Sequence, residues 1–150
     1  MGINRLRAFL RRHRQIALDT SIFIYQLEAN ERYLPLTDSI FAWLERPGSK
    51  AVTSTITMTE LLVQHYRESD EQRVDEFYGL LSTYPNLEWI APNLETADLA
   101  ARLRAVHRLR TPDALQAATG LYAGATALIS NDTIFERVEG LEPLTLDHLI

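Results

Sequence analysis

Four acidic residues stand where the sequence predicts a strand to end or a helix to begin. They are Asp19, Glu60, Asp113 and Asp132. In an open parallel α/β sheet, the residues that follow the strands meet along one edge, and ligands bind at that edge. We therefore expect the four carboxylates to lie close together at one edge of a sheet.

Each acid has an ordinary structural explanation when it is considered alone. Thr57 and Glu60 have the spacing of a helix capping box. Asp113 suits the first turn of a helix, where the helix dipole favours negative charge, and Asp19 and Asp132 suit N-caps. These roles remain alternatives for each residue singly.

Together, however, the acids need a counter-charge. Two like charges about 4 Å apart, at an effective dielectric near 20, repel by about 4 kcal/mol. Ligands that offer only oxygen favour a hard cation such as Mg²⁺ or Mn²⁺. One or two such ions can activate water and stabilise in-line displacement at a phosphodiester. The pattern therefore predicts metal-dependent phosphodiester hydrolysis.

The composition excludes several other chemistries. The chain has no cysteine, so disulfides, thiol nucleophiles and Cys-ligated metals are absent. The four histidines lack metal-ligand spacing, and the single lysine, Lys50, lies in a turn. Ser21 and Ser130 have no evident His–acid partner, and the six glycines form no phosphate-binding loop.

The formal net charge is −5, but the first 18 residues carry no acid and five arginines, Arg5, Arg7, Arg11, Arg12 and Arg14. Leu6, Phe9 and Leu10 in the same segment have the spacing of one helix face. Two interpretations remain open. The segment is either a helix docked by these apolar residues or a contact for phosphate or an anionic membrane surface.

A second basic stretch precedes Asp113 and consists of Arg102, Arg104, Arg108 and Arg110. We expect it to bind phosphate beside the acids, because guanidinium groups bind phosphate in bidentate geometry. The alternative is a solvated helix face, in which pairs such as Asp98–Arg102 stabilise the helix.

Short apolar segments alternate with helical periodicity along the chain. Strands are expected at 15–18, 51–55, 87–90, 127–130 and 143–146, with helices at 20–28, 36–44, 57–66, 69–84, 94–109 and 111–124 and a short turn or helix at 132–138. Strands separated by helices imply crossover connections. The predicted fold is an α/β, three-layer α/β/α sandwich with a short, mainly parallel sheet. Its expected organisation is a basic extension over 1–14 and a nuclease domain over 15–150.

The start of the chain does not resemble a signal peptide, because arginines interrupt any apolar stretch. No run reaches the roughly 18 apolar residues of a transmembrane helix. We expect a cytoplasmic protein that does not enter a membrane.

Four segments, 18–21, 57–61, 109–118 and 130–135, occur in an order that resembles the PIN domain family, and specifically VapC-type toxin ribonucleases. The resemblance covers about residues 15–148. It implies Mg²⁺- or Mn²⁺-dependent endonucleolytic cleavage of RNA by metal-activated water. It also implies that Asp19, Asp113 and Asp132 hold the metal, whereas Glu60 completes the shell or orients the water.

The same resemblance implies that Thr20, Ser21 and Asn131 support the site. It further implies a homodimer and a cognate antitoxin, which would bind an apolar groove on the early helices. The aromatic residues expected to form that groove are Phe23, Tyr25, Phe41 and Trp43.

Other functions stay open at this point. An aspartyl-phosphate enzyme would use Asp19, but Ser21 stands where a second Asp is wanted, and Lys50 is poorly placed. A DNA 5′-nuclease would need additional DNA-binding elements. A non-toxin PIN-domain RNA-processing nuclease, or a non-catalytic module that binds RNA or protein, is the remaining alternative.

Overall fold

The computed structural model describes residues 2–150, and Met1 lies outside the described residues. A five-stranded sheet forms its centre, in the order β3-β2-β1-β4-β5, and every neighbouring pair is parallel. The strands are β1 (Gln15–Leu18), β2 (Lys50–Ser54), β3 (Leu87–Ile90), β4 (Ala127–Ser130) and β5 (Glu142–Thr145). The predicted parallel sheet is confirmed.

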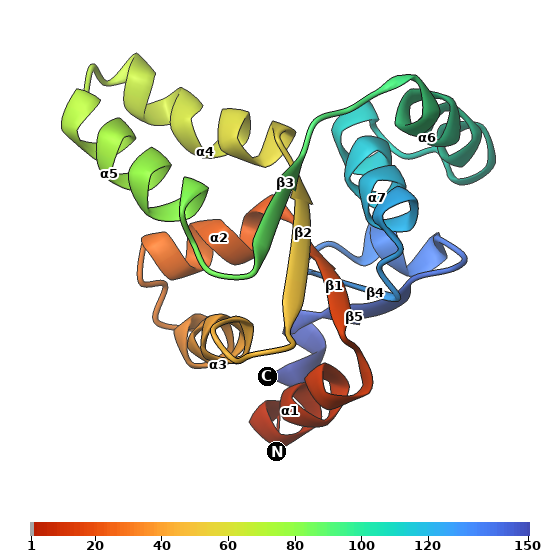
Figure 1. The fold of residues 1–150 in the computed structure, drawn as a ribbon, viewed down its shortest axis with the longest axis horizontal. Coiled ribbons are helices and arrows are strands. Elements are labelled where there is room, and N and C mark those ends of the chain that lie inside the picture. Colours follow the sequence, from red (N-terminus) through yellow and green to blue (C-terminus); the bar gives the residue numbers. More distant parts are fainter. Residues whose placement is uncertain (1) are drawn as a thin grey trace.

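Helices cover both faces of this sheet (Figure 1). They are α1 (Gly2–Arg12), α2 (Thr20–Leu27), α3 (Leu34–Leu44), α4 (Ile56–Arg67), α5 (Glu71–Ser82), α6 (Leu94–His107) and α7 (Thr111–Ala123), with 3₁₀ turns η1 (Thr133–Arg137) and η2 (Leu146–Leu149). One core lies under α1, α2 and α3, and a second lies under α6 and α7. The α/β/α sandwich is therefore confirmed.

The central strands are apolar on both sides because both of their faces are covered. Ile16 and Leu18 of β1 enter the core under α1 to α3, whereas Ala17 between them enters the core under α6 and α7. This alternation follows from the two-residue side-chain period of a strand. For this reason most residues of strands β1 and β4 are apolar in the sequence.

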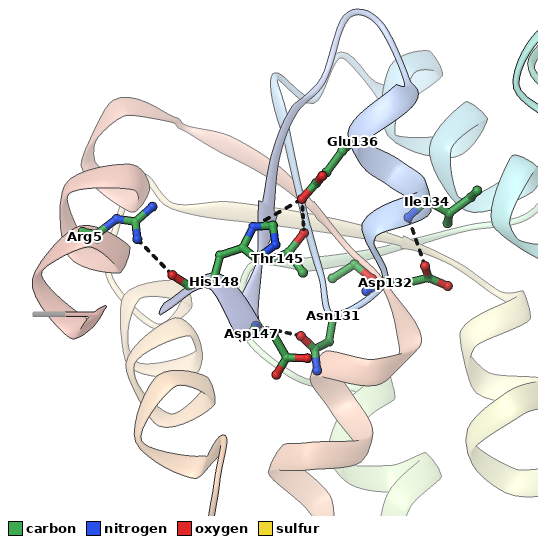
Figure 2. Close-up of polar contacts among 9 residues, drawn as sticks. Arg5, Asn131, Asp132, Ile134, Glu136, Thr145, Asp147 and His148 are labelled. Carbon is green, nitrogen blue, oxygen red and sulfur yellow. Dashed lines mark hydrogen bonds and ion pairs between the residues drawn. The ribbon is translucent and has the colours of Figure 1, made fainter. Parts of the chain in front are cut away.

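The N-terminal helix α1 packs into the main core. Leu6, Phe9 and Leu10 are buried there, as their helical spacing predicts. Polar contacts also tie α1 to the C-terminal segment: Arg5 donates to the carbonyl of His148 at 2.9 Å (Figure 2), and Arg12 pairs with Glu142. The docked-helix interpretation is thus confirmed, and the division at residue 14 stays a prediction.

No helix formed by residues 2–150 is both long and apolar enough to span a bilayer.

Leu6→Ala should lower the free energy of unfolding by about 2–5 kcal/mol, because it leaves a cavity in the core between α1 and the sheet. Val106→Ala on α6 is the control, since Val106 is 72% exposed. That change should stay within about 0.5 kcal/mol. Urea unfolding monitored by circular dichroism measures both. Equal effects would show that α1 is not part of the folded core.

Candidate active site

The acids converge because of the sheet topology. Strands β1 and β4 are parallel neighbours, with Leu18 opposite Ile129, so the residues that follow them leave the same edge of the sheet. Asp19 follows β1, and Asp132 follows β4. Asp19, Glu60, Asp113 and Asp132 all line one open cavity of about 430 Å³. The structure therefore brings together the four acids singled out in the sequence.

Asp113 reaches this edge because α7 lies close against the sheet. A Cβ on Gly120 of α7 would lie 2.9 Å from the methyl group of Ala17 in β1, so only glycine permits this approach without a shift. Helix α7 leads into the amino end of β4, and its own first turn therefore lies at the carboxyl edge. Asp113 stands in that first turn, beside Asp19.

Asp19 is the most buried of the four carboxylates. Its Oδ2 accepts a hydrogen bond from Ser130 Oγ at 2.8 Å. The pKa of Asp19 is raised to about 6, chiefly by burial and to a smaller extent by the negative charges of Asp113 and Glu60, while the Ser130 bond acts in the opposite direction. No cation is among the causes of the shift in the Asp19 pKa.

Asp113 and Asp132 form the second part of the site. Burial raises the pKa of Asp113, the neighbouring Arg110 guanidinium lowers it, and the charge of Asp132 raises it. The Nε of Arg110 lies 3.4 Å from Asp113 Oδ2. Asp132 is the N-cap of η1, as expected for this position, and its Oδ1 accepts from the Ile134 N–H at 3.0 Å (Figure 2).

Glu60 is held by a side chain from another helix. Its Oε1 accepts from Thr20 Oγ1 at 2.6 Å. The capping box expected from Thr57 and Glu60 is absent, because α4 begins at Ile56 and its N-cap is Thr55. That interpretation was wrong because Thr57 is buried and its hydroxyl is engaged with Thr53 at 2.7 Å.

The sequence analysis missed a buried polar network beneath the acids. Gln116 of α7 is 3% exposed; its Nε2 donates to Thr57 Oγ1 at 2.5 Å, and its Oε1 accepts from the Ser54 N–H at 3.3 Å. Thr20 Oγ1 donates its one proton to Glu60 and lies 3.3 Å from Thr57 Oγ1. The network therefore joins the helices that carry Asp113 and Glu60. A glutamine among the alanines of 114–118 was the available signal.

Asn131 links the site to the C-terminal segment. Its Nδ2 donates to the Tyr25 hydroxyl at 3.0 Å, and its Oδ1 accepts from the Asp147 N–H at 2.8 Å (Figure 2). The Asn131 N–H donates to Ser21 Oγ at 3.2 Å, and Ser21 Oγ lies 3.5 Å from Asp19 Oδ2. Asn131 and Ser21 thus connect the end of β4 and the C-terminal segment to the cavity that Asp19 lines.

The second basic stretch is only partly at the site. Arg110 lines the acidic cavity, whereas Arg102, Arg104 and Arg108 are not among its lining residues. Arg102 pairs with Asp98, as the helix-face alternative expects, and Arg104 Nε donates to the Leu109 carbonyl at 2.9 Å. The structure therefore places one of the four arginines beside the acids.

The expected aromatic groove is absent. Phe23, Phe41 and Trp43 are buried in the core, with exposures of 0%, 4% and 8%. Tyr25 alone of the four residues lines the acidic cavity. This prediction was wrong because the faces of α2 and α3 that carry these aromatic residues cover the sheet.

The site fits a hard divalent cation by the chemistry of its donors. Four carboxylates face a single guanidinium, that of Arg110, so the lining residues carry a formal excess of negative charge. As the side chains stand in residues 2–150, no three acids or histidines are grouped closely enough to hold an ion by themselves. Mg²⁺ does not require such a cage, because it commonly binds through one or two carboxylates, retained water and substrate phosphate.

A parallel α/β/α fold with an acidic cavity at the carboxyl edge defines the class of this protein. A family model described as PIN domain matches residues 16–141, and the chain belongs to that family. A search of curated protein sequences finds no match.

Solved structures share the fold. A chain of a toxin–antitoxin complex from Klebsiella pneumoniae is 25% identical, with a TM-score of 0.63, over 87% of this chain and 97% of that chain. VapBC-1 from nontypeable Haemophilus influenzae is 21% identical, with a TM-score of 0.67, over 89% of this chain and 98% of that chain. VapC20 from Mycobacterium tuberculosis, a toxin that cleaves the sarcin–ricin loop, is 18% identical, with a TM-score of 0.64, over 85% of this chain and 97% of that chain.

Asp19→Asn should stabilise the metal-free protein at pH 7.5 by up to about 3 kcal/mol, since the pKa rises by about two units and each unit is worth about 1.4 kcal/mol. Burying the charged form destabilises the folded state above the folded pKa of about 6. The gain should therefore shrink through the range from about pH 6 to 4 and vanish below the unfolded pKa.

Chemical unfolding at several pH values in excess chelator measures this gain. Asp75→Asn, at an exposed position of α5, is the control and should change stability by less than about 0.5 kcal/mol. An Asp19→Asn protein that is less stable than the wild type at pH 7.5 would contradict the prediction that the buried Asp19 charge destabilises the folded state.

Gln116→Leu should destabilise the protein by about 1–3 kcal/mol, because it leaves the buried Ser54 N–H without its side-chain acceptor. Gln72→Leu, at an exposed position of α5, is the matched control and should have little effect. Thermal and urea unfolding compare the two variants. A Gln116→Leu protein as stable as the control would show that the network is dispensable.

Proposed function

We propose that this protein is a divalent-metal-dependent endoribonuclease and the toxin of a type II toxin–antitoxin pair. The observation that carries the proposal is the convergence of Asp19, Glu60, Asp113 and Asp132 in one cavity, in a chain of the PIN domain family. The fold shared with VapC20, which cleaves the sarcin–ricin loop, supports RNA as the class of substrate.

In this proposal Asp19, Asp113 and Asp132 hold Mg²⁺ or Mn²⁺. The ion would supply Lewis-acid activation of water and offset charge at the scissile phosphate. Ser130 fixes the rotamer of Asp19 through its 2.8 Å hydrogen bond, and η1 fixes Asp132 through the Ile134 N–H. These bonds hold the carboxylates in place before the ligand arrives, which lowers the cost of ordering the site.

Glu60 orients the attacking water in the proposed mechanism. Thr20 binds its Oε1, and the buried Thr57–Gln116 pair in turn holds the Thr20 hydroxyl. Thr20 therefore acts as a positioning residue for Glu60, while Ser21 and Asn131 position Asp19 and the start of η1. Arg110 neutralises part of the charge of Asp113 and lies where it can meet substrate phosphate.

A cognate antitoxin is the proposed protein partner, because structures with the same fold are toxin–antitoxin complexes from K. pneumoniae and other bacteria. The surface that suits it is an apolar hollow of about 480 Å³ on α4, lined by residues that include Met58, Leu62, Val63 and Tyr66. Val63 also lines the acidic cavity, so one partner could cover both. We also propose a homodimer and a cytoplasmic location, as the family resemblance implies.

Purified protein should cut RNA in Mg²⁺ or Mn²⁺, and Asp19→Asn or Asp113→Asn should lower the rate by at least about 100-fold, since each removes a charge that holds the ion. Gel electrophoresis of a labelled RNA measures cleavage, and Asp75→Asn is the matched control. Excess chelator should abolish cleavage by the wild type.

Cleavage that survives both substitutions, or that persists in chelator, would overturn the proposed mechanism. Specific binding of RNA without cleavage in any divalent ion would favour the non-catalytic alternative instead.

A further inference from the structure

A basic groove lies between α1 and α3, away from the acidic cavity. It is a hollow of about 480 Å³, and its lining residues include Arg7, Arg11, Arg46, Asp38, Leu10 and Trp43. Leu10 and Trp43 are largely buried and form an apolar floor, whereas the three arginines are exposed. We define these residues as the α1–α3 groove.

The three guanidinium groups of the groove have no counter-ion. Within residues 2–150, those of Arg7, Arg11 and Arg46 make neither a hydrogen bond nor an ion pair, although Arg5 and Arg12 on the same helix are both engaged. Asp38 is the only acid among the lining residues, and its Oδ1 already accepts from Gln26 at 2.9 Å. The groove therefore carries an uncompensated positive charge.

The arrangement of the arginines suits a chain of phosphates. Arg7 and Arg11 are one helical turn apart, which places them about 6 Å apart along α1, and like charges at this spacing destabilise an isolated helix. Arg46 follows the end of α3 and lies on the other wall of the groove. Planar guanidinium groups bind phosphate oxygens in bidentate geometry. A polyanion that runs along α1 would relieve the repulsion at successive positions.

RNA is the polyanion that the rest of the molecule favours. The acidic cavity itself repels RNA, because four carboxylates there face one arginine, and the protein as a whole carries a net charge of −5. Arg102 is paired with Asp98, and Arg104 is bonded to a backbone carbonyl. Attraction of an RNA strand therefore requires a separate positive surface.

We propose that the α1–α3 groove is a second RNA-binding site that holds the phosphate backbone of the substrate outside the cleavage site. This inference rests on the proposal that RNA is the substrate. Helix α1 ends just before β1 begins, whereas Asp19 follows the end of β1. The acidic cavity and the Arg11 end of the groove are thus separated by at least the length of β1, about 13 Å. Only an RNA of several nucleotides reaches both.

The test measures binding of fluorescein-labelled single-stranded RNA to the Asp19→Asn protein without divalent ions. Adding Arg7→Gln and Arg11→Gln should weaken binding of an RNA of about 30 nucleotides by about tenfold and lower the salt slope, d log K/d log [salt], by about 1.4. Cleavage of an RNA of about four nucleotides by the protein that retains Asp19 should change less than about twofold, because so short an RNA does not reach both sites.

The matched control carries Arg67→Gln and Arg73→Gln, which remove the same charge from exposed positions on α4 and α5. Because the guanidinium groups of Arg7 and Arg11 make no hydrogen bond or ion pair within residues 2–150, the double substitution should not lower the thermal unfolding midpoint. Equal losses of RNA affinity in the two double variants, or an unchanged salt slope, would overturn the proposal that the groove binds RNA. So would a polyglutamate peptide that binds the groove more tightly than RNA, since it would make an acidic protein the occupant.

Cleavage by the wild-type active site separates this inference from the proposed function. If the protein cuts no RNA but the groove variants still lose RNA affinity selectively, the nuclease proposal fails and the groove stands. The opposite outcome is that the wild type cuts RNA, that both double variants cut long and short RNA at wild-type rates, and that both bind RNA with equal affinity. In that case the groove does not bind the substrate, and the nuclease proposal stands.

Discussion

Burial of negative charge at one edge of the sheet is the constraint on which the rest of the site depends. Burial is the largest of the effects that raise the pKa of Asp19 to about 6, and the neighbouring acids Asp113 and Glu60 contribute less. The fold holds the carboxylates together by giving each of them a hydrogen-bond donor. Those donors are Ser130, Thr20, Arg110 and the Ile134 N–H. The donors fix the geometry but leave most of the negative charge uncompensated, so the site favours a cation.

The donors are themselves positioned by packing and by buried hydrogen bonds. Gln116 joins α7 to the end of β2 and to Thr57 of α4, and Thr57 in turn contacts Thr20 at the start of α2. Buried networks of this kind are rigid when every member is satisfied, because breaking one bond leaves an unpaired polar group in a low dielectric. The network explains how acids from separate helices keep a common geometry.

Opposite charges occupy opposite parts of the molecule. The acidic cavity lies beyond the carboxyl ends of β1 and β4, whereas the α1–α3 groove extends toward the amino end of β1. The net charge of −5 conceals this separation. A protein with a negative net charge therefore also presents a locally positive surface, at a distance from its acidic cavity.

The sequence by itself determined the parallel sheet and the four acids, because both depend on local rules. Two-residue and 3.6-residue periodicities set strands and helices, and a parallel topology sends the residues after β1 and β4 to one edge. The buried face of α1 was predictable for the same reason, from Leu6, Phe9 and Leu10.

Only the tertiary structure decided which side chains meet across elements. Thr57 had the spacing of a cap, but it bonds to Thr53 and Gln116, and Phe23, Phe41 and Trp43 looked available for a partner, but they fill the core. Arg7 and Arg102 were equally basic in the sequence. Asp98 pairs with Arg102, whereas within residues 2–150 no side chain forms an ion pair or hydrogen bond with the Arg7 guanidinium. Such partners come from residues distant in the chain, and local periodicity carries no information about them.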